Sequence, residues 1–273
     1  MDYFKDKVAI VTGGASGIGR ALCEELGQKG AVVIVADINT KGAQQVASAV
    51  ATAGGQARGV YLDVSQAEDV QNLVNETASQ HGRLDFMFNN AGIVVIGEVR
   101  DISLEHWIRH LDVNLSGIIY GATAAYSLMV RQGSGHIVNT ASLAGLTGAP
   151  TLTPYTTTKY AVVGLSTALR AEGADLGVRV SVVCPGFVQT GMLDAPVLKA
   201  NRDELLSRLP ARAIWDPTKA ARVILRGVAR NRSIIVFPFY ARLLWWLHRL
   251  HPAISAFWAG KTIRDFRDLR ARQ

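Results

Sequence analysis

The chain has 273 residues, of which 49% are hydrophobic and 19% charged, and its formal net charge is +7. This composition is sufficient for a sizeable core and excludes a disordered chain, and the only two cysteines, Cys23 and Cys184, indicate free thiols in a reducing compartment rather than disulfides or a metal site. The first residues do not form a signal peptide and no stretch reaches about 18 consecutive apolar residues, so we expect a cytoplasmic protein without a conventional membrane span.

Short apolar runs alternate with helical patterns along most of the chain. The runs are rich in Val and Ile and predict seven strands, at 7–11, 32–36, 57–64, 84–90, 135–142, 178–186 and 233–238. The intervening patterns predict helices at about 17–29, 40–53, 66–80, 104–131, 154–176 and 217–230. Nearly continuous apolar strands joined by helices indicate an α/β fold, a Rossmann-like doubly wound parallel sheet with helices on both faces. We expect one domain over residues 1–238, followed by a helical extension over 239–273.

The stretch TGGASGIG (12–19) lies where the first strand ends and the first helix begins. Glycines at 13, 17 and 19 permit a tight turn and a close approach of a phosphate to the backbone, and the helix N-terminus offers free N–H groups. The spacing is GxxxGxG, which differs from the GxGxxG dinucleotide fingerprint. A glycine-rich turn without a ligand is the alternative, but the position after the first strand favours a dinucleotide site.

Acidic and amide side chains follow the next strands. Asp37 ends the second strand, where a carboxylate accepts hydrogen bonds from an adenosine ribose and repels a 2′-phosphate, so we expect NAD rather than NADP. A strand-terminal turn aspartate is the alternative. Asp63 and Val64 end the predicted third strand and would face the adenine, while NNAG (89–92) either lines the cofactor or braces the sheet.

The stretch TPYTTTKYA (153–161) carries the strongest candidate chemistry. Pro154 suits a first helical turn that Thr153 can cap, and Tyr155 and Lys159 then lie on one helix face. A free phenol titrates near pH 10, so its use as a base at neutral pH costs roughly 4 kcal/mol, which a nearby cation reduces. YxxxK also occurs by chance, and an ordinary helix start with a surface lysine is the alternative. Two further candidates are Asn114 within a helix and Ser142 after the fifth strand.

Six motifs in this order resemble the short-chain dehydrogenase/reductase family: TGxxxGIG, NNAG, a mid-helix Asn, a Ser after strand five, YxxxK and PG after strand six. The resemblance covers about residues 5–240 and implies an NAD(P)-dependent oxidoreductase that interconverts an alcohol and its carbonyl compound. It implies that Tyr155 is the general acid/base and that Lys159 lowers the Tyr155 pKa and holds the nicotinamide ribose. Ser142 would orient the substrate oxygen, and Asn114 would hold a water that links Lys159 to solvent.

The resemblance also implies cofactor contacts and self-association. The cofactor-contacting positions are Gly13, Ser16, Gly17, Ile18, Gly19, Asp37, Asp63, Val64, Asn90, Ala91, Gly92, Tyr155, Lys159, Pro185, Gly186, Val188 and Thr190. Members of the family usually associate through two helices, here about 104–131 and 154–176, so we expect a homodimer or homotetramer.

The segment after Gly186 is where the family places its variable substrate lid. The residues that we expect near the substrate are apolar, and no carboxylate-binding arginine stands out among them: Val94, Val95, Leu143, Leu152, Phe187, Met192 and Leu193. We therefore expect a lipophilic alcohol or ketone, such as a steroid-like, retinoid-like, long-chain or aromatic compound. The alternative is that some of these side chains belong to the core.

The C-terminal part is basic and aromatic. From position 226 to the end there are ten Lys/Arg and two Asp/Glu, and three of the five tryptophans follow position 238. One hypothesis is an interfacial anchor that docks on an anionic membrane leaflet. The alternative is a pair of helices packed on the body or on a partner subunit, covering the mouth of the pocket.

Three other functions fit the sequence less well than an enzyme does. A dinucleotide-binding regulator that has lost the chemistry should show a broken Ser–Tyr–Lys set, whereas this chain keeps all three residues. Nucleic-acid binding is disfavoured because the tail arginines are diluted by large apolar side chains. Sugar-nucleotide chemistry is disfavoured because no sizeable C-terminal substrate domain follows.

Overall fold

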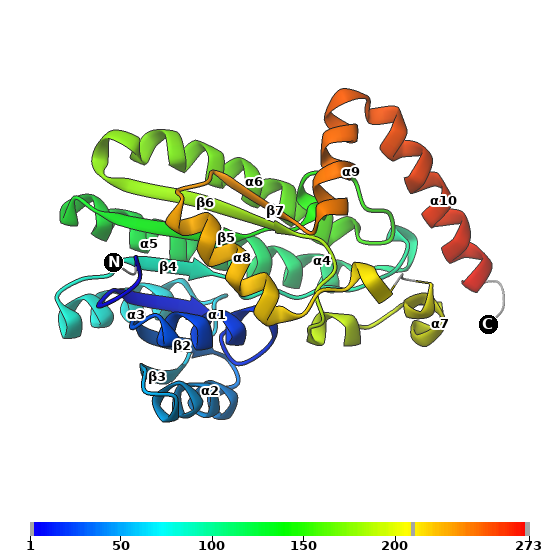
Figure 1. Ribbon diagram of the computed structural model, residues 1–273. Coiled ribbons are helices and arrows are strands. Elements are labelled where there is room, and N and C mark those ends of the chain that lie inside the picture. Colours follow the sequence, from blue (N-terminus) through cyan, green and yellow to red (C-terminus); the bar gives the residue numbers. More distant parts are fainter. Residues whose placement is uncertain (1–2, 209–210, 271–273) are drawn as a thin grey trace.

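A seven-stranded parallel sheet forms the centre of the computed structural model, which describes residues 3–208 and 211–270 (Figure 1). The strands lie in the order β3-β2-β1-β4-β5-β6-β7, and every pair is parallel. Their bounds are β1 (Val8–Thr12), β2 (Val32–Asp37), β3 (Gln56–Tyr61), β4 (Phe86–Asn89), β5 (Gly135–Thr140), β6 (Val178–Pro185) and β7 (Ile234–Phe237). The predicted doubly wound sheet is therefore confirmed, and its order reverses between β1 and β4, where ligands bind in such folds.

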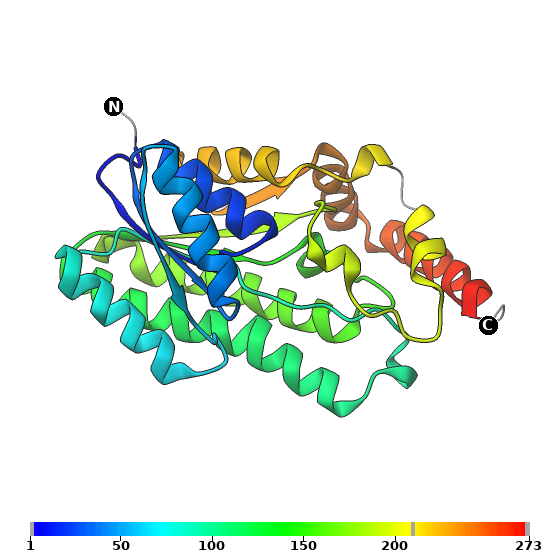
Figure 2. The same ribbon diagram turned by 90° about the horizontal axis from the view of Figure 1, so that it is seen from below.

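Helices cover both faces of the sheet (Figure 2). One face carries α1 (Gly17–Gln28), α2 (Thr40–Thr52) and α8 (Pro217–Ala229), and the other carries α3 (Ala67–His81), α5 (Gly117–Gln132) and α6 (Thr153–Gly173). Side chains alternate along each strand, so Ala9 and Val11 of β1 face the first layer while Val8 and Ile10 face the second. The two cores that result hold the carboxyl ends of the strands at one common edge.

The edge strand β3 differs from its prediction. We expected a strand over 57–64 that is buried on both faces, but β3 ends at Tyr61 and its residues are exposed or half-buried. The Asp63 carboxylate accepts hydrogen bonds from the backbone N–H and the hydroxyl of Ser65, both within 2.9 Å, and this turn follows the end of strand pairing. Asp63 and Val64 therefore lie in the turn beyond the strand.

The predicted helix over 104–131 is interrupted. It consists of α4 (Leu104–His110), a π-helical turn (Leu111–Ser116) and α5. By length and composition alone, the stretch Leu104–Gln132 could cross a membrane, a candidate that the sequence analysis did not anticipate. However, α5 packs on β4, β5 and α3, so the α5 part of this stretch belongs to the core of the α/β layers.

The helix that carries Tyr155 begins at Thr153. Thr153 was expected to cap α6, but it is the first helical residue, and Leu152 precedes it without a side-chain capping bond. The tail folds into α9 (Phe239–Leu250) and α10 (Pro252–Arg270), a pair of helices that projects beyond the β7 edge and then returns toward the short helix α7 (Arg202–Ser207) (Figure 1).

The last part of α10 packs on the body of the protein. Phe266 and Leu269 are each 1% exposed and form a small cluster with Ala200, against which Ile96, Val197 and Leu205 pack. The Arg267 guanidinium donates to the Glu98 carboxylate at 2.9 Å, and Arg270 pairs with Asp101. Of the two alternatives for the tail, packing on the body therefore applies to this end of α10.

Candidate active site

The glycine-rich turn between β1 and α1 has a backbone that only glycine adopts easily. Gly13 and Gly17 have φ angles of +64° and +53°. A Cβ on Gly13 would lie 2.8 Å from the Ala91 Cα, and one on Gly19 would overlap the Gly13 carbonyl oxygen. Ser16 precedes α1 without a capping bond from its side chain. The turn therefore presents bare backbone and helix N–H groups, which fit the phosphates of a dinucleotide.

Asp37 lies at the carboxyl end of β2, as predicted, and fastens the turn. One carboxylate oxygen accepts from the backbone N–H of Ala15 at 3.0 Å, and the other accepts from that of Asn39 at 2.9 Å. The side chain is half-buried, so the remaining lone pairs of its oxygens are open to a ligand beside the turn. This position fits the adenosine ribose of a dinucleotide.

Thr12 braces the same turn, a role that the sequence analysis missed. Its hydroxyl oxygen accepts from the backbone N–H groups of Asn90 and Ala91 at 3.0 and 3.1 Å. The Asn90 amide in turn donates to the Thr12 carbonyl oxygen at 3.1 Å. The NNAG segment therefore does brace the sheet, and it also lies beside the glycine-rich turn. The position of Thr12 could have indicated this role, because Thr12 is the first residue of the glycine-rich stretch TGGASGIG.

The segment after β6 folds over the turn. Pro185 is the last residue of β6, and the Gly186 N–H donates to the Phe237 carbonyl oxygen at 2.7 Å. A Cβ on Gly17 would lie 2.9 Å from the methyl carbon of Thr190, so these two residues touch across the start of α1. Further along the segment, Val188 forms an isolated parallel β-bridge with Trp215. The predicted cofactor residues from both halves of the sheet thus lie at one edge, and those of the glycine-rich turn form a cradle that fits a dinucleotide.

Three predicted catalytic side chains meet at this edge. Tyr155 on α6 is buried, and the Ser142 side chain lies close enough to lower its pKa. The Lys159 ammonium is 1% exposed and donates to the Thr140 carbonyl oxygen at 2.8 Å, which places it 5.4 Å from the centroid of the Tyr155 ring. The Thr140 carbonyl is a second contact that sequence reasoning missed, because spacing does not show backbone acceptors.

Asn114 lies close to the same group but faces the β4 loop. It is fully buried in the π-helical turn, where its amide oxygen accepts from the Ile93 N–H at 2.8 Å and its amide nitrogen donates to the Ile93 carbonyl at 2.9 Å. A Cβ on Gly92 would lie 3.2 Å from the Asn114 oxygen, 3.6 Å from the Lys159 nitrogen and 3.4 Å from the Met192 methyl carbon. Gly92 therefore lies beside both predicted catalytic residues and the lid.

Burial dominates the electrostatics of the catalytic pair. It raises the pKa of Tyr155 from its usual 10, and the hydrogen bond with Ser142 offsets only part of that rise. Burial also lowers the pKa of Lys159 to about 8. The sequence analysis expected Lys159 to lower the pKa of Tyr155, but in the chain alone both groups are shifted toward their neutral forms because both are removed from water.

The predicted substrate residues differ in exposure. Met192 is half-buried and reaches the Gly92 region, as expected for a lid residue. Val95 is 2% exposed, which fits the core alternative, while Phe187 is 41% exposed. The remaining four are half-buried: Val94, Leu143, Leu152 and Leu193. A further contact comes from the tail, because the Tyr240 hydroxyl of α9 accepts from the Phe187 N–H at 2.8 Å.

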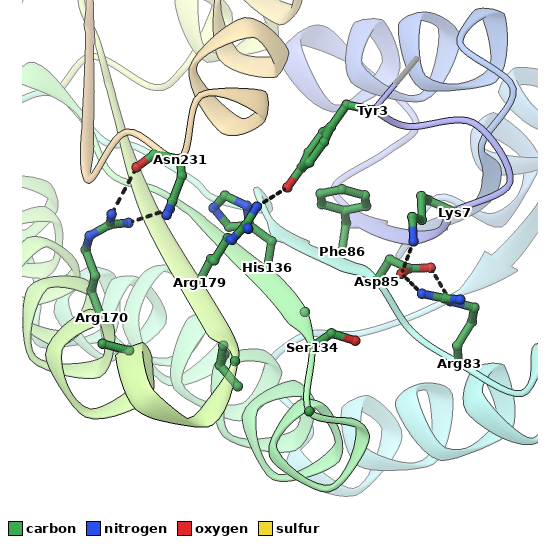
Figure 3. Close-up of a pocket in the computed structure, with 15 residues that line it drawn as sticks. Tyr3, Lys7, Arg83, Asp85, Phe86, Ser134, His136, Arg170, Arg179 and Asn231 are labelled. Atoms are coloured by element: carbon green, nitrogen blue, oxygen red, sulfur yellow. Dashed lines mark hydrogen bonds and ion pairs between the residues drawn. The ribbon is translucent and has the colours of Figure 1, made fainter. Parts of the chain in front are cut away.

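A separate crevice of about 540 Å³ lies at the amino ends of the strands, opposite the catalytic edge (Figure 3). No predicted site residue lines it, and its charged groups pair with one another, with neutral polar side chains or with backbone. Asp85 binds both Arg83 and Lys7, Arg179 donates to the Tyr3 hydroxyl, and Arg170 donates to backbone carbonyls and to Asn231. These pairings stabilise the ends of strands and helices, so we assign the crevice a structural role.

Comparison with known proteins agrees with this geometry. Residues 7–200 match the family model described as short chain dehydrogenase. The chain is 36% identical over 235 residues to cyclohexanol dehydrogenase of Acinetobacter sp. (strain SE19), covering 85% of this chain and 91% of that one. It is 42% identical over 195 residues to 2,5-dichloro-2,5-cyclohexadiene-1,4-diol dehydrogenase of Sphingobium indicum, covering 71% and 77%.

A solved structure gives the same result. The crystal structure of a short-chain dehydrogenase/reductase from Burkholderia phymatum in complex with NAD superposes with a TM-score of 0.84 at 30% identity, covering 93% of this chain and 96% of that one. The chain belongs to the short-chain dehydrogenase/reductase family. It is an oxidoreductase that acts on CH–OH groups and binds a nicotinamide dinucleotide.

Proposed function

We propose that the protein is an NAD-dependent dehydrogenase that interconverts a lipophilic secondary alcohol and its ketone, with Tyr155 as general acid/base. The observation that carries this proposal is that Ser142, Tyr155 and the Lys159 ammonium lie together next to Gly92 of the NNAG segment, which contacts the glycine-rich turn. Bound NAD accepts the hydride from the carbinol carbon. The residues of the chain bind the alcohol oxygen and move its proton.

The proton transfer is assigned from the positions of the side chains. Ser142 and Tyr155 together form a two-point site for one substrate oxygen, in which Ser142 orients the oxygen and Tyr155 takes its proton. The Lys159 ammonium donates to the Thr140 carbonyl, and this bond holds its positive charge close to Tyr155, where the phenolate would form. Asn114 positions the β4 loop through Ile93 and keeps Gly92 close to Lys159.

Preference for NAD over NADP rests on Asp37. Its carboxylate is fixed by two backbone N–H groups at the end of β2, so it cannot readily turn away from a ligand on the turn. A fixed negative charge at this place repels a 2′-phosphate and accepts hydrogen bonds from an unmodified ribose.

The substrate class rests on the lid and on the relatives. Met192 and Leu193 are half-buried next to the catalytic edge and are apolar. Two relatives are named for cyclohexanol and for a chlorinated cyclohexadiene diol, both secondary alcohols on a six-membered ring. Apolar walls and these names together favour an alicyclic alcohol among the lipophilic compounds that we expected.

Self-association is proposed through α4, α5 and α6. Four large apolar side chains on the α4–α5 stretch are exposed and recur at helical spacing: Leu104, Ile108, Leu111 and Ile119. Tyr160 on α6 is also exposed. A stripe of this kind fits an interface between two copies. Sedimentation velocity of Ile108→Glu, compared with Tyr61→Glu on the edge strand β3, tests it: only the first should lower the mass of the assembly.

The enzyme assay uses the purified protein with NAD and a panel that begins with cyclohexanol and extends to larger lipophilic alcohols. NADH absorbance reports turnover, and mass spectrometry should find a product lighter by two hydrogens. Tyr155→Phe keeps the ring but lacks the proton acceptor, so turnover should fall by about 10²–10⁴-fold. Turnover that survives in Tyr155→Phe would refute the assignment, and absence of turnover with NAD and NADP in both directions would favour a protein that binds the dinucleotide without catalysis.

A further inference from the structure

One face of α9 is apolar and exposed. Phe239, Leu243, Trp246 and Leu250 are 76%, 48%, 64% and 70% exposed. At about 100° per residue they fall within roughly 60° of the helix circumference. The opposite face holds Ala241 and Trp245, which pack against the sheet-side core, so the packing of this chain accounts for that face alone. Four neighbouring large apolar side chains in water indicate a surface with a partner.

The charges beside this face are positive. Arg242 and Arg249 are exposed along one flank of the stripe, and the sequence of α9 contains no Asp or Glu. Arg249 lies 5.5 Å from the centroid of the Trp245 ring. At the start of α10, Phe257 is 67% exposed, and Lys261 and Arg264 follow it on exposed positions. Large apolar groups flanked by cations are typical of helices that lie in the interface of an anionic membrane.

We propose that the exposed face of α9 docks on an anionic lipid bilayer. Its apolar side chains would enter the boundary between headgroups and acyl chains, and Arg249 would bind lipid phosphates. A second copy of this chain fits less well, because two-fold packing of α9 on itself would bring like charges together with no acid on either helix to pair with them. The stripe on α4–α5 is also a separate surface that is available for self-association.

The helix that would dock also contacts the active site. The Tyr240 hydroxyl accepts from the N–H of Phe187 at 2.8 Å, one residue beyond the Pro185–Gly186 pair. At the other end of the hairpin, α10 packs on Val197, Ala200 and Leu205 of the lid segment. If the proposed function holds, docking would bring the lid next to the acyl layer, from which a lipophilic alcohol could enter.

Vesicle sedimentation of the full-length protein tests the docking. The protein should pellet with vesicles that contain phosphatidylglycerol, pellet much less with pure phosphatidylcholine, and lose binding as salt is raised. Trp246→Glu and Arg249→Glu should each lower the partition onto anionic vesicles by at least about tenfold. Leu176→Glu is the matched control for Trp246→Glu, since it places the same charge at an exposed apolar residue away from α9, and it should bind like the parent protein.

Two results would overturn the proposal. One is a full-length protein that never pellets with anionic vesicles, and the other is binding that Trp246→Glu and Arg249→Glu leave intact. A loss of assembly mass in Trp246→Glu without any vesicle binding would assign the face to a second copy instead. Turnover of a water-soluble alcohol without vesicles is measured separately, so failure of docking and failure of the proposed enzyme activity can be told apart.

Discussion

Replacing Phe266 by alanine tests whether α10 holds the two loops that flank the catalytic edge. The ring is 1% exposed and lies in a small cluster of its own, apart from the two cores that cover the sheet. It contacts residues of both loops, which follow β4 and β6. Loss of a buried phenylalanine ring costs about 3–5 kcal/mol, and the lower end applies here because loops can close part of the cavity.

A cost of about 3 kcal/mol corresponds to a change of roughly 150-fold in the equilibrium between α10 packed on the two loops and α10 detached from them. Hydrogen exchange should therefore accelerate in residues 96–101, 197–205 and 260–270, by up to that factor. The thermal midpoint of the sheet should change little, because the cluster is not part of its cores. The KM for substrate should rise, since Met192 and Leu193 lie only a few residues before the released segment 197–205.

Phe257→Ala is the matched control. It makes the same change on the same helix, but at a side chain that is 67% exposed, so exchange in the two loops should stay as in the parent protein. Unchanged exchange in Phe266→Ala would show that the ion pairs of Arg267 and Arg270 hold the helix without the ring. Equal acceleration in the central strands would show that α10 unfolds only with the whole molecule.

Three further outcomes follow from individual side chains. Burial lowers the pKa of His136 to about 3, so as pH falls below about 6.5 the unfolded chain binds a proton at His136 while the folded chain does not. The free energy of unfolding, measured in urea, should therefore drop by about 2 kcal/mol between pH 7 and pH 5. His136→Gln should flatten this pH dependence, and an unchanged slope would assign it to another group. Asp37→Ala should lower the ratio of kcat/KM for NAD to that for NADP by at least about tenfold, and an unchanged ratio would place the discrimination elsewhere. In the protein without cofactor, burial raises the pKa of Tyr155 from its usual 10. In an absorbance titration, the parent protein and Tyr155→Phe should therefore show the same phenolate signal below pH 10, and an additional step in the parent protein would contradict this.

The features that could be predicted from the sequence are those encoded in short segments. A parallel strand buried on both faces reads as an apolar run, and the residue that ends it lies at the ligand edge, so Asp37 and Asn90 were placed correctly. The i, i+4 spacing of Tyr155 and Lys159 holds in α6, which keeps both side chains buried at the same site. Each of these positions depends on a few neighbouring residues.

The features that could not be predicted depend on distant partners or on solvent exclusion. Arg267 and Glu98 are 169 residues apart, and neither segment has a pattern that names the other. The polar edge strand β3 reads like a buried one because period alone does not show which strand is last in the sheet. The π-helical turn around Asn114 forms where its amide pairs with Ile93, and helical periodicity continues across it.

The spacing of Tyr155 and Lys159 alone does not show how burial shifts their pKa values. A cation near a phenol lowers the pKa of the phenol when water surrounds both, but here α6 buries both groups, and removal from water raises the pKa of Tyr155 and lowers that of Lys159. In such surroundings a charge is costly when it stands alone and is strongly stabilised when its partner appears beside it. Ser142 accepts from the Ala144 N–H and Lys159 donates to the Thr140 carbonyl, so both side chains are already held in place before a phenolate forms. If Tyr155 transfers the proton as proposed, the charge that develops lies beside Lys159, and this placement comes from the fold around α6 as well as from the YxxxK spacing.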